Sequence, residues 1–413
     1  MASLDNVFVA RQPIFNRRRN LWGYEVFIRH CGENQCSSID DEAYADSALI
    51  ADGYSVGAKG LGPDKFICIN IGSQAILENA HLALPNQSVV LEIKAFDDVS
   101  QAKALLKQVK KQGYRVRLSY SKVLGENESI LQLAHCIKVD FFDFEPKEII
   151  GIRSKLKKYD GELIAANVDD WQSFEGAKVL GFNYFQGCFF SQPEIVPGRK
   201  VSNERTSFLR LLRVLADEDI QPQKVLAVIS SEPTLAYRLL RYINSPAFGV
   251  SNEISNLDRA VCMLGFQPLR SWALAACITC VDDSDKGSAL GWYSLHRAQF
   301  LRLAAENDLI SGWSPESSFL LGLFSNIDAV FGAPMEDILD DLPLSEVLKD
   351  ALLGKNEMSE WLQLLQALEK GQLRVVQDAI FRMGVPAFKA SKLYLHATRL
   401  ANETMLAGAE GLN

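Results

Sequence analysis

In the first half of the chain, short runs of aliphatic and β-branched residues alternate with longer stretches whose apolar residues recur at helical spacing. The short runs predict strands at residues 7–12, 21–28, 65–71, 89–93, 115–118, 136–139, 163–166 and 184–189. The longer stretches predict helices at residues 40–54, 72–78, 99–112, 126–133, 145–158 and 170–180. Strand followed by helix, repeated about eight times, is typical of an α/β barrel or a doubly wound sheet. A length of about 200 residues lies at the small end of barrel size, and we expect a TIM-type α/β barrel.

The pattern changes at residues 192–199, where prolines and a glycine predict a linker. Beyond this segment leucines and alanines recur at helical spacing, and Ser231 is the predicted N-cap of a helix with Pro233 in its first turn. Further helices are predicted at residues 257–264, 268–280, 292–307, 315–331, 344–353, 358–370, 372–383 and 386–407. We therefore expect two domains, an α/β barrel at 1–197 and an all-α helical domain at 198–413.

The composition narrows the class of protein. With 413 residues and 48% hydrophobic content, the chain is long enough for two globular cores, and its net charge of −8 does not favour nucleic-acid binding. It shows no secretory signal at its start and no apolar run of the roughly 18 residues that a membrane span needs. Its eight cysteines are scattered, which suits a reducing compartment. We expect a cytoplasmic protein, in which the basic run at residues 17–19 is a hairpin turn or loop edge.

Polar side chains occur where the predicted barrel strands end. They are Glu25, Asn70, Glu92, Lys138, Asp140 and Gln186. In a TIM-type barrel the chemistry is assembled at the carboxyl ends of the strands, so these side chains are expected to converge. Carboxylates and an amide oxygen are the ligands of a hard divalent cation, and a nearby lysine would position a water molecule or neutralise a phosphate.

Residues 5–195 resemble the EAL family of cyclic di-GMP phosphodiesterases, with the motifs in the family's order. The matching residues are Glu25-Val26-Phe27 with Arg29, Phe66-Ile67-Cys68-Ile69-Asn70-Ile71, Leu91-Glu92-Ile93, Lys138-Val139-Asp140 and Phe185-Gln186-Gly187. The resemblance implies that Glu25, Asn70 and Glu92 correspond to metal ligands and that Lys138 corresponds to a residue that positions the attacking water. It also implies that Arg29, Gln186 and Asp140 would contact the nucleotide.

The departures from the family's motifs fall on its acidic positions. Ser119-Tyr120 stands where the family has the paired aspartates that bridge two metals, and Ala165-Ala166-Asn167-Val168-Asp169 stands for Ala-Glu-Gly-Val-Glu. Lys94-Ala95 also replaces a threonine and a glutamate. Two-metal hydrolysis needs both cations to clamp the attacking and leaving oxygens. We therefore expect no catalysis and no metal cofactor, with Glu25, Asn70, Glu92 and Lys138 as vestiges of a Mg²⁺ or Mn²⁺ site.

Three alternatives stay open for the barrel. The retained polar side chains would only hydrogen-bond the strand ends, or the barrel would bind cyclic di-GMP without cleaving it. In the third alternative a slow phosphodiesterase remains, with Asp140 and Asp169 in place of the missing aspartate pair.

The second half, from about residue 200 to 407, resembles the HDOD domain, a catalytically inactive relative of the HD phosphohydrolases. The residues that carry the resemblance are 225–235, 239–245 and 258–265. HD enzymes hold a metal with a His-Asp pair, whereas the corresponding run here, 322–328, contains no histidine. His296 is isolated, and we expect it to be a surface or core residue.

An EAL-like domain followed by an HDOD domain resembles the bacterial signalling family called YuxH-like. The resemblance implies a role in regulation related to cyclic di-GMP. We also expect a regulatory protein partner to bind through the HDOD domain, because this helical half shows no other chemistry. The partner, the regulated process and the oligomeric state are not indicated by the sequence.

Overall fold

The computed structural model describes residues 7–31, 36–38, 50, 54–55, 58, 64–93, 99–121, 127–192, 203–217, 219–244, 257–282 and 284–409. The chain forms two compact units, one from residues 1–190 and 364–395 and the other from residues 191–363 and 396–413. The domain boundary predicted at residues 197 and 198 lies outside the described residues and stays a prediction.

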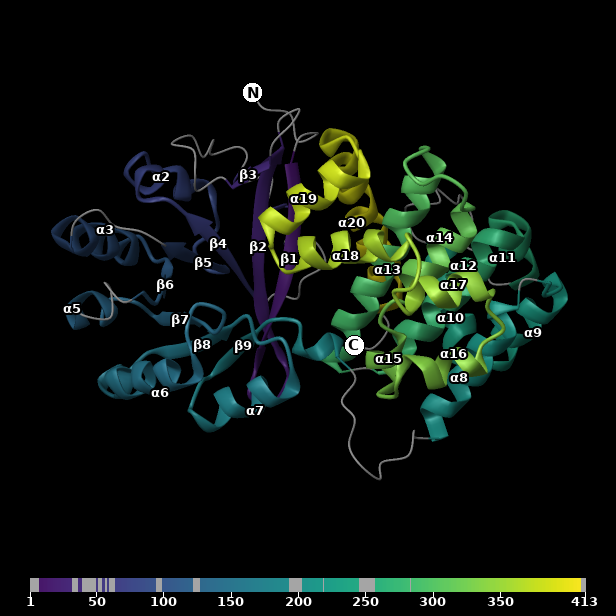
Figure 1. Ribbon diagram of the computed structural model, residues 1–413, viewed down its shortest axis with the longest axis horizontal. Helices are drawn as coiled ribbons and strands as arrows, with labels where there is room; N and C mark the ends of the chain where they lie inside the picture. Colours follow the sequence, from purple (N-terminus) through teal and green to yellow (C-terminus); the bar gives the residue numbers. More distant parts are fainter. Residues whose placement is uncertain are drawn as a thin grey trace. The chain divides into compact units, whose positions relative to one another are not determined.

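The strands of the first unit close into a barrel (Figure 1). They are β1 (Val7–Asn16), β2 (Leu21–Cys31), β3 (Cys36–Ser38), β4 (Phe66–Ile71), β5 (Val89–Ile93), β6 (Arg115–Ser119), β7 (Cys136–Asp140), β8 (Glu162–Ala166) and β9 (Tyr184–Gln186). The strand order β1-β9-β8-β7-β6-β5-β4-β2 returns to β1 through a β1–β2 pairing, and β3 adds to β2 outside this ring. The predicted barrel is confirmed, although β1 extends four residues beyond its predicted end, β9 ends three residues early and β3 was not predicted.

One strand of the ring differs from an all-parallel TIM barrel. β1 is antiparallel to β2 and to β9, whereas the neighbours from β2 through β4 to β9 are parallel. Residues 17–20 join β1 to β2, which is too short for the crossover that parallel strands need. Arg19 has a left-handed φ of 66° and donates its N–H to the Asn16 carbonyl at 2.9 Å. The basic run at 17–19 is therefore a hairpin turn, as predicted.

Helices and 3₁₀ turns connect the parallel strands. They are α2 (Ser73–Leu77), η3 (Ala80–Ala83), α3 (Val99–Lys111), α5 (Glu128–Leu131), α6 (Pro146–Lys155), η4 (Leu156–Lys158) and α7 (Trp171–Val179), and η5 (Phe189–Ser191) follows β9. Side-chain capping explains where two of these helices begin. Glu145 and Glu148 form a reciprocal capping box at α6, and the Asp170 carboxylate accepts the Ser173 N–H at 2.7 Å at α7. The predicted helix at residues 40–54 falls almost entirely outside the described residues.

The barrel interior is apolar in one layer and polar in the next. The apolar layer consists of Ile14, Cys68, Val90, Cys136 and Ile164, which are fully buried. Because side chains two residues apart on a strand share a face, Asn70, Glu92 and Lys138 also point inward, one layer nearer the carboxyl ends of β4, β5 and β7. The alternation of the strands thus places the polar residues at the barrel mouth.

The described part of the second unit is helical, as predicted. Its helices are α8 (Asn203–Ala216), α9 (Pro222–Ser231), α10 (Pro233–Ile243), α11 (Leu257–Leu264), α12 (Phe266–Cys280), α13 (Asp285–Glu306), α14 (Pro315–Phe324), α15 (Ile327–Phe331), α16 (Met335–Asp341) and α17 (Glu346–Leu352). The last helices are α18 (Ser359–Glu369), α19 (Leu373–Met383) and α20 (Ala387–Ala409), and residues 364–395 of this stretch belong to the first unit. Within the described residues, no helix combines the length and the apolar character that crossing a bilayer requires.

The helical half differs from the prediction in several details: α8, α9 and α16 were not among the predicted helices, and α13 begins at Asp285 instead of residue 292. Ser231 is not the N-cap of α10, because Glu232 occupies that position and the Ser231 hydroxyl, at the end of α9, donates to the Val228 carbonyl at 2.9 Å. The helix predicted at 315–331 is two helices, interrupted at Ser325 and Asn326.

Candidate functional site

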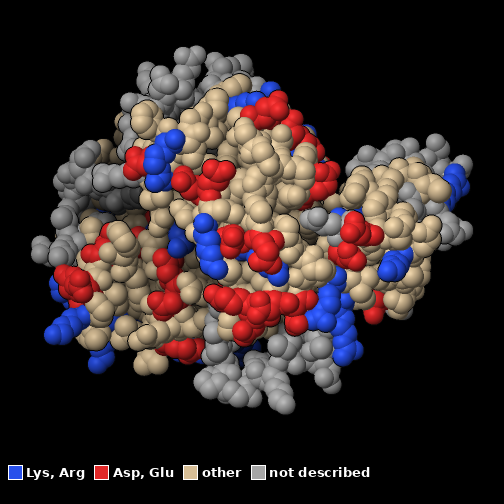
Figure 2. Space-filling model, turned by 45° about the vertical axis from the view of Figure 1, so that its right-hand side comes forward, with Lys and Arg blue, Asp and Glu red and all other residues tan. Residues whose placement is uncertain are grey.

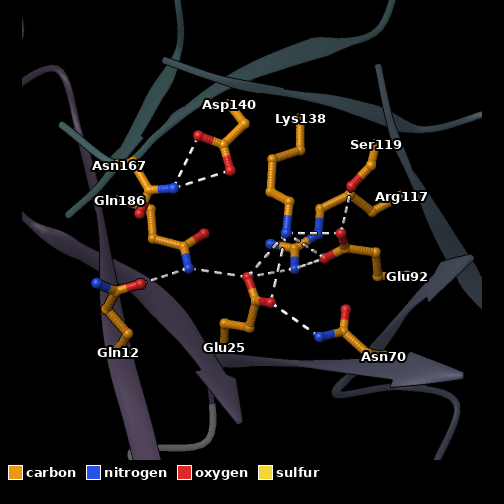
Figure 3. A network of polar contacts seen from close by, with 10 residues as sticks. All are labelled: Gln12, Glu25, Asn70, Glu92, Arg117, Ser119, Lys138, Asp140, Asn167 and Gln186. Atoms are coloured by element: carbon orange, nitrogen blue, oxygen red, sulfur yellow. Dashed lines mark hydrogen bonds and ion pairs between the residues drawn. The ribbon is translucent and has the colours of Figure 1, made fainter. Parts of the chain in front are cut away.

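The mouth of the barrel contains a polar network built from seven strands (Figure 3). Glu25 on β2 lies at its centre and is buried, with 1% of its surface exposed. Asn70 donates to its Oε1 at 3.1 Å, and Gln186 donates to its Oε2 at 2.8 Å. Gln186 also donates to the Oε1 of Gln12 on β1 at 2.7 Å. The structure therefore brings together predicted residues that lie far apart in the sequence.

Arg117 on β6 is part of this network, although the sequence analysis did not identify it as a site residue. It is completely buried, and its Nη2 donates to Glu25 Oε2 at 2.6 Å and to Glu92 Oε2. One guanidinium nitrogen thus bridges two carboxylates that extend from β2 and β5. Strand alternation could have identified Arg117. It lies two residues before Ser119, which occupies a position of the family's metal site, so both side chains are on the same face of β6.

Lys138 on β7 supplies a second cation. Its Nζ lies 2.6 Å from Glu92 Oε1 and 3.3 Å from Glu25 Oε2. Burial acts to lower the pKa of Arg117, but Cys68, Glu25 and Glu92 act to raise it, and the net effect is a raised pKa that keeps the guanidinium protonated. Two buried carboxylates therefore face two cations from the chain itself.

Ser119 and Tyr120, which occupy the positions of the family's paired aspartates, have uncharged side chains. The Ser119 hydroxyl donates to Glu92 Oε1 at 2.5 Å. Tyr120 is buried, and its ring packs edge-to-face against Phe144 with centroids 5.9 Å apart. These two residues provide a hydrogen-bond donor and an apolar contact, and neither contributes negative charge to the mouth.

Asp140 forms a separate pair with Asn167. Nδ2 of Asn167 donates to the two carboxylate oxygens of Asp140 at 2.7 and 2.8 Å. Asp169 accepts the backbone N–H of Cys188 at 3.3 Å. These contacts do not join Asp140 or Asp169 to the Glu25–Glu92 pair, which argues against both as replacements for the missing aspartates.

Arg29 and Lys94, which the sequence indicated as site residues, have side chains that lie outside the described part of the structure. The backbone of Arg29 belongs to β2, where it pairs with Phe8 and Ser38. Its side chain lies outside the described residues, and so does Lys94, so the predicted nucleotide contact of Arg29 stays a prediction.

The mouth does not fit the divalent pair that the resemblance implies. To bind a metal, a carboxylate must direct an oxygen lone pair at it, and here the oxygens of Glu25 and Glu92 accept hydrogen bonds from Arg117 and Lys138. Within the described part of the chain, no group of three or more His, Cys, Asp or Glu side chains is placed to hold a metal ion.

In the helical unit, an arginine on another helix contacts the run that corresponds to the HD pair. Nη1 of Arg297 on α13 donates to Ser325 Oγ and to Asn326 Oδ1, each at 3.0 Å. His296 is fully buried, its ring stacked on Trp292 with centroids 5.0 Å apart and its Nε2 3.2 Å from Thr398 Oγ1. His296 is thus a core residue with polar and aromatic contacts, one of the two locations expected.

Comparison with known proteins agrees with the two-part architecture. The HDOD domain model matches residues 205–335. The chain is 30% identical over 376 residues to the uncharacterized protein YuxH of Bacillus subtilis, covering 88% of this chain and 90% of that protein. It is 28% identical over 385 residues to the cyclic di-GMP phosphodiesterase CdgJ of Vibrio cholerae, covering 91% of this chain and 88% of that protein.

Solved structures with EAL domains are also similar to part of the chain. The YkuI protein of Bacillus subtilis, with an EAL domain and in complex with the substrate c-di-GMP and calcium, is 19% identical. The match covers 63% of this chain and 72% of that chain, with a TM-score of 0.37.

Proposed function

The chain belongs to the family of EAL–HDOD proteins that includes YuxH, and from this membership we propose that it transmits a signal related to cyclic di-GMP without hydrolysing the nucleotide. In this proposal the EAL barrel is catalytically inactive. The output is contact with a regulatory protein, made through the HDOD domain.

One observation carries the proposal of inactivity: Glu25 and Glu92 are both bound by Arg117 and Lys138. Hydrolysis by a metal pair depends on carboxylates that hold two cations beside the scissile phosphate. Here a divalent ion would have to displace a guanidinium and an ammonium from a buried position. The internal cations therefore support a barrel without phosphodiesterase chemistry.

A hydrolysis assay tests this proposal. Purified full-length protein is incubated with cyclic di-GMP and Mg²⁺ or Mn²⁺, and the linear dinucleotide product is measured by chromatography. We expect no product above the level of a protein-free control. Turnover that Glu25→Ala abolishes would refute the proposal, because it would show that the network supports catalysis.

The receptor alternative has an observation in its favour. Asn70 Oδ1 and Gln186 Oε1 are buried acceptors without a hydrogen-bond partner among the described residues, so donors on a bound ligand would satisfy them. Calorimetry with cyclic di-GMP, on the native chain and on Arg29→Ala, separates a receptor from a scaffold. Binding no tighter than millimolar would remove the receptor alternative.

The proposed partner surface lies on the HDOD domain. Tyr237 on α10 and Met263 on α11 are large apolar side chains with about half of their surface exposed, at 53% and 48%. Crosslinking in cells with the full-length chain and with a Tyr237→Ala, Met263→Ala double variant tests the surface. We expect the double variant to lose a specific crosslinked protein. An unchanged crosslinking pattern, with an unchanged circular dichroism spectrum, would place the contact elsewhere.

A further inference from the structure

We infer that Arg117 is an internal cation that replaces a divalent metal as the structural centre of the barrel mouth. The inference rests on the proposed inactive barrel and makes a separate claim about its stability. According to it, the native mouth is complete without metal, whereas removing the guanidinium converts the mouth into a site whose stability depends on a divalent ion.

The first support is the geometry of one atom. Nη2 of Arg117 contacts Glu25 Oε2 at 2.6 Å and also contacts Glu92 Oε2, so a single positive group joins carboxylates from β2 and β5. Figure 3 shows the guanidinium between the two glutamates, with Lys138 beside it. A bridging metal would make the same connection between two carboxylates.

The second support is burial. Arg117 and Glu92 have no exposed surface, and Glu25 has 1%. A buried carboxylate is tolerated only when it is paired, since its desolvation is not otherwise compensated. Without Arg117, the two carboxylates would lose the buried guanidinium that joins them.

The third support is the ligand set that would remain. Glu25 and Glu92 would offer carboxylate oxygens, and Asn70 would offer Oδ1, a buried acceptor that has no hydrogen-bond partner among the described residues. Carboxylate and amide oxygens suit hard divalent ions. These three residues would therefore favour Mn²⁺ once the guanidinium is gone.

The test uses the full-length chain and Arg117→Met, which keeps an unbranched side chain but removes the charge. Arg115→Met is the matched control, because Arg115 lies two residues away on β6 and pairs with Glu162 at 3.1 Å, with about a third of its side chain exposed. Thermal unfolding is measured in EDTA and in Mn²⁺, and Mn²⁺ binding is measured by equilibrium dialysis.

We expect the native chain and Arg115→Met to unfold at the same temperature in EDTA and in Mn²⁺. Arg117→Met should unfold at a lower temperature in EDTA and recover by about 2 °C or more in Mn²⁺. If Arg117→Met does not fold, the double variant Arg117→Met, Glu92→Gln is used, since it also removes one negative charge. It should fold in EDTA and show no response to Mn²⁺.

Three results would overturn the inference: native protein stabilised by Mn²⁺, Arg117→Met as stable as the native chain in EDTA, or Arg117→Met weakened without a response to Mn²⁺. Failure of the double variant to fold would also overturn it. None of these results implies turnover of cyclic di-GMP, so the hydrolysis assay judges the proposed function separately.

Discussion

Asn167 holds the carboxylate of Asp140 through its amide nitrogen, at 2.7 and 2.8 Å from the two oxygens. Asn167 has a left-handed backbone, with φ at 53°. Asparagine tolerates this conformation better than most residues and also supplies the amide. One residue thus provides both the turn after β8 and the partner of Asp140.

Two substitutions separate these contributions. Asn167→Gly removes the hydrogen bonds but keeps the backbone relaxed, so we expect a loss of about 1–2 kcal/mol in the free energy of unfolding. Asn167→Ala should cost about 1 kcal/mol more, because alanine is strained at this φ. Urea unfolding measures both. Equal stability of the two variants would contradict the argument from the backbone.

The thiols inside the barrel should be unreactive. Burial raises the pKa of Cys68 to about 12 and that of Cys136 to about 12. At pH 8 the thiolate fraction is then on the order of one in ten thousand, which leaves almost no nucleophile. We expect maleimide labelling followed by peptide mass spectrometry to modify the exposed Cys262 and to spare both barrel thiols until urea is added. Labelling of Cys68 in the folded protein would show that the barrel interior opens readily.

His135 should make the protein less stable in mild acid. Burial, aided by the charges of Lys110 and Arg115, lowers its pKa in the folded state. The unfolded chain therefore takes up the proton first, and the stability present above the ordinary histidine pKa of about 6.5 is lost as the pH falls toward the lower folded-state value. His135→Asn retains an acceptor for the Val116 N–H, which Nδ1 accepts at 3.0 Å. Unfolding free energies between pH 7.5 and 5.5 should fall more steeply for the native chain; parallel curves would count against this assignment.

Gly322 allows α13 and α14 to cross closely. A Cβ at this position would lie 2.3 Å from the backbone nitrogen of Ala298 and 2.4 Å from the carbonyl carbon of Arg297. Because backbone atoms cannot rotate away, we expect Gly322→Ala to cost about 2–3 kcal/mol and to lower the unfolding temperature of the helical unit. Gly176→Ala on α7 is the control, since its Cβ would meet no atom within 4 Å. If Gly322→Ala were as stable as this control, the close crossing would not be required.

The sequence predicted the barrel well because its strands are short apolar runs, each separated from the next by a polar or helical stretch. It also predicted the hairpin turn at residues 17–19. The antiparallel direction of β1 was not predicted. It follows from the short turn between β1 and β2, whereas the prediction rested on the alternation of strands and helices and did not consider the length of each connection.

The site was predicted in part. Six residues were expected to converge, and five of them do: Glu25, Asn70, Glu92, Lys138 and Gln186. The sixth, Asp140, pairs with Asn167 instead. Arg117 was missed because an arginine in a strand is usually on the solvent side, and its role depends on Glu25, which is 92 residues away in the chain. Only the closed ring shows that these two strands face each other.

The helical half shows the limits of local rules. Ser231 is a favourable capping residue by type, but it is the last residue of α9, so its hydroxyl bonds backward to Val228. The break at Ser325 and Asn326 is held by Arg297 from another helix, a contact that helical periodicity along the chain cannot reveal.

The antiparallel β1 also determines when the barrel can close during synthesis. β1 leaves the ribosome before the other strands of the ring, yet one of its edges pairs with β9, where Ile14 meets Gln186. Until Tyr184–Gln186 has been made, the nascent hairpin carries an open strand edge that other chains can pair with. Closure of the ring therefore joins the first and last strands of the barrel in a late step of high contact order. Translation that stalls before β9 should leave an aggregation-prone fragment.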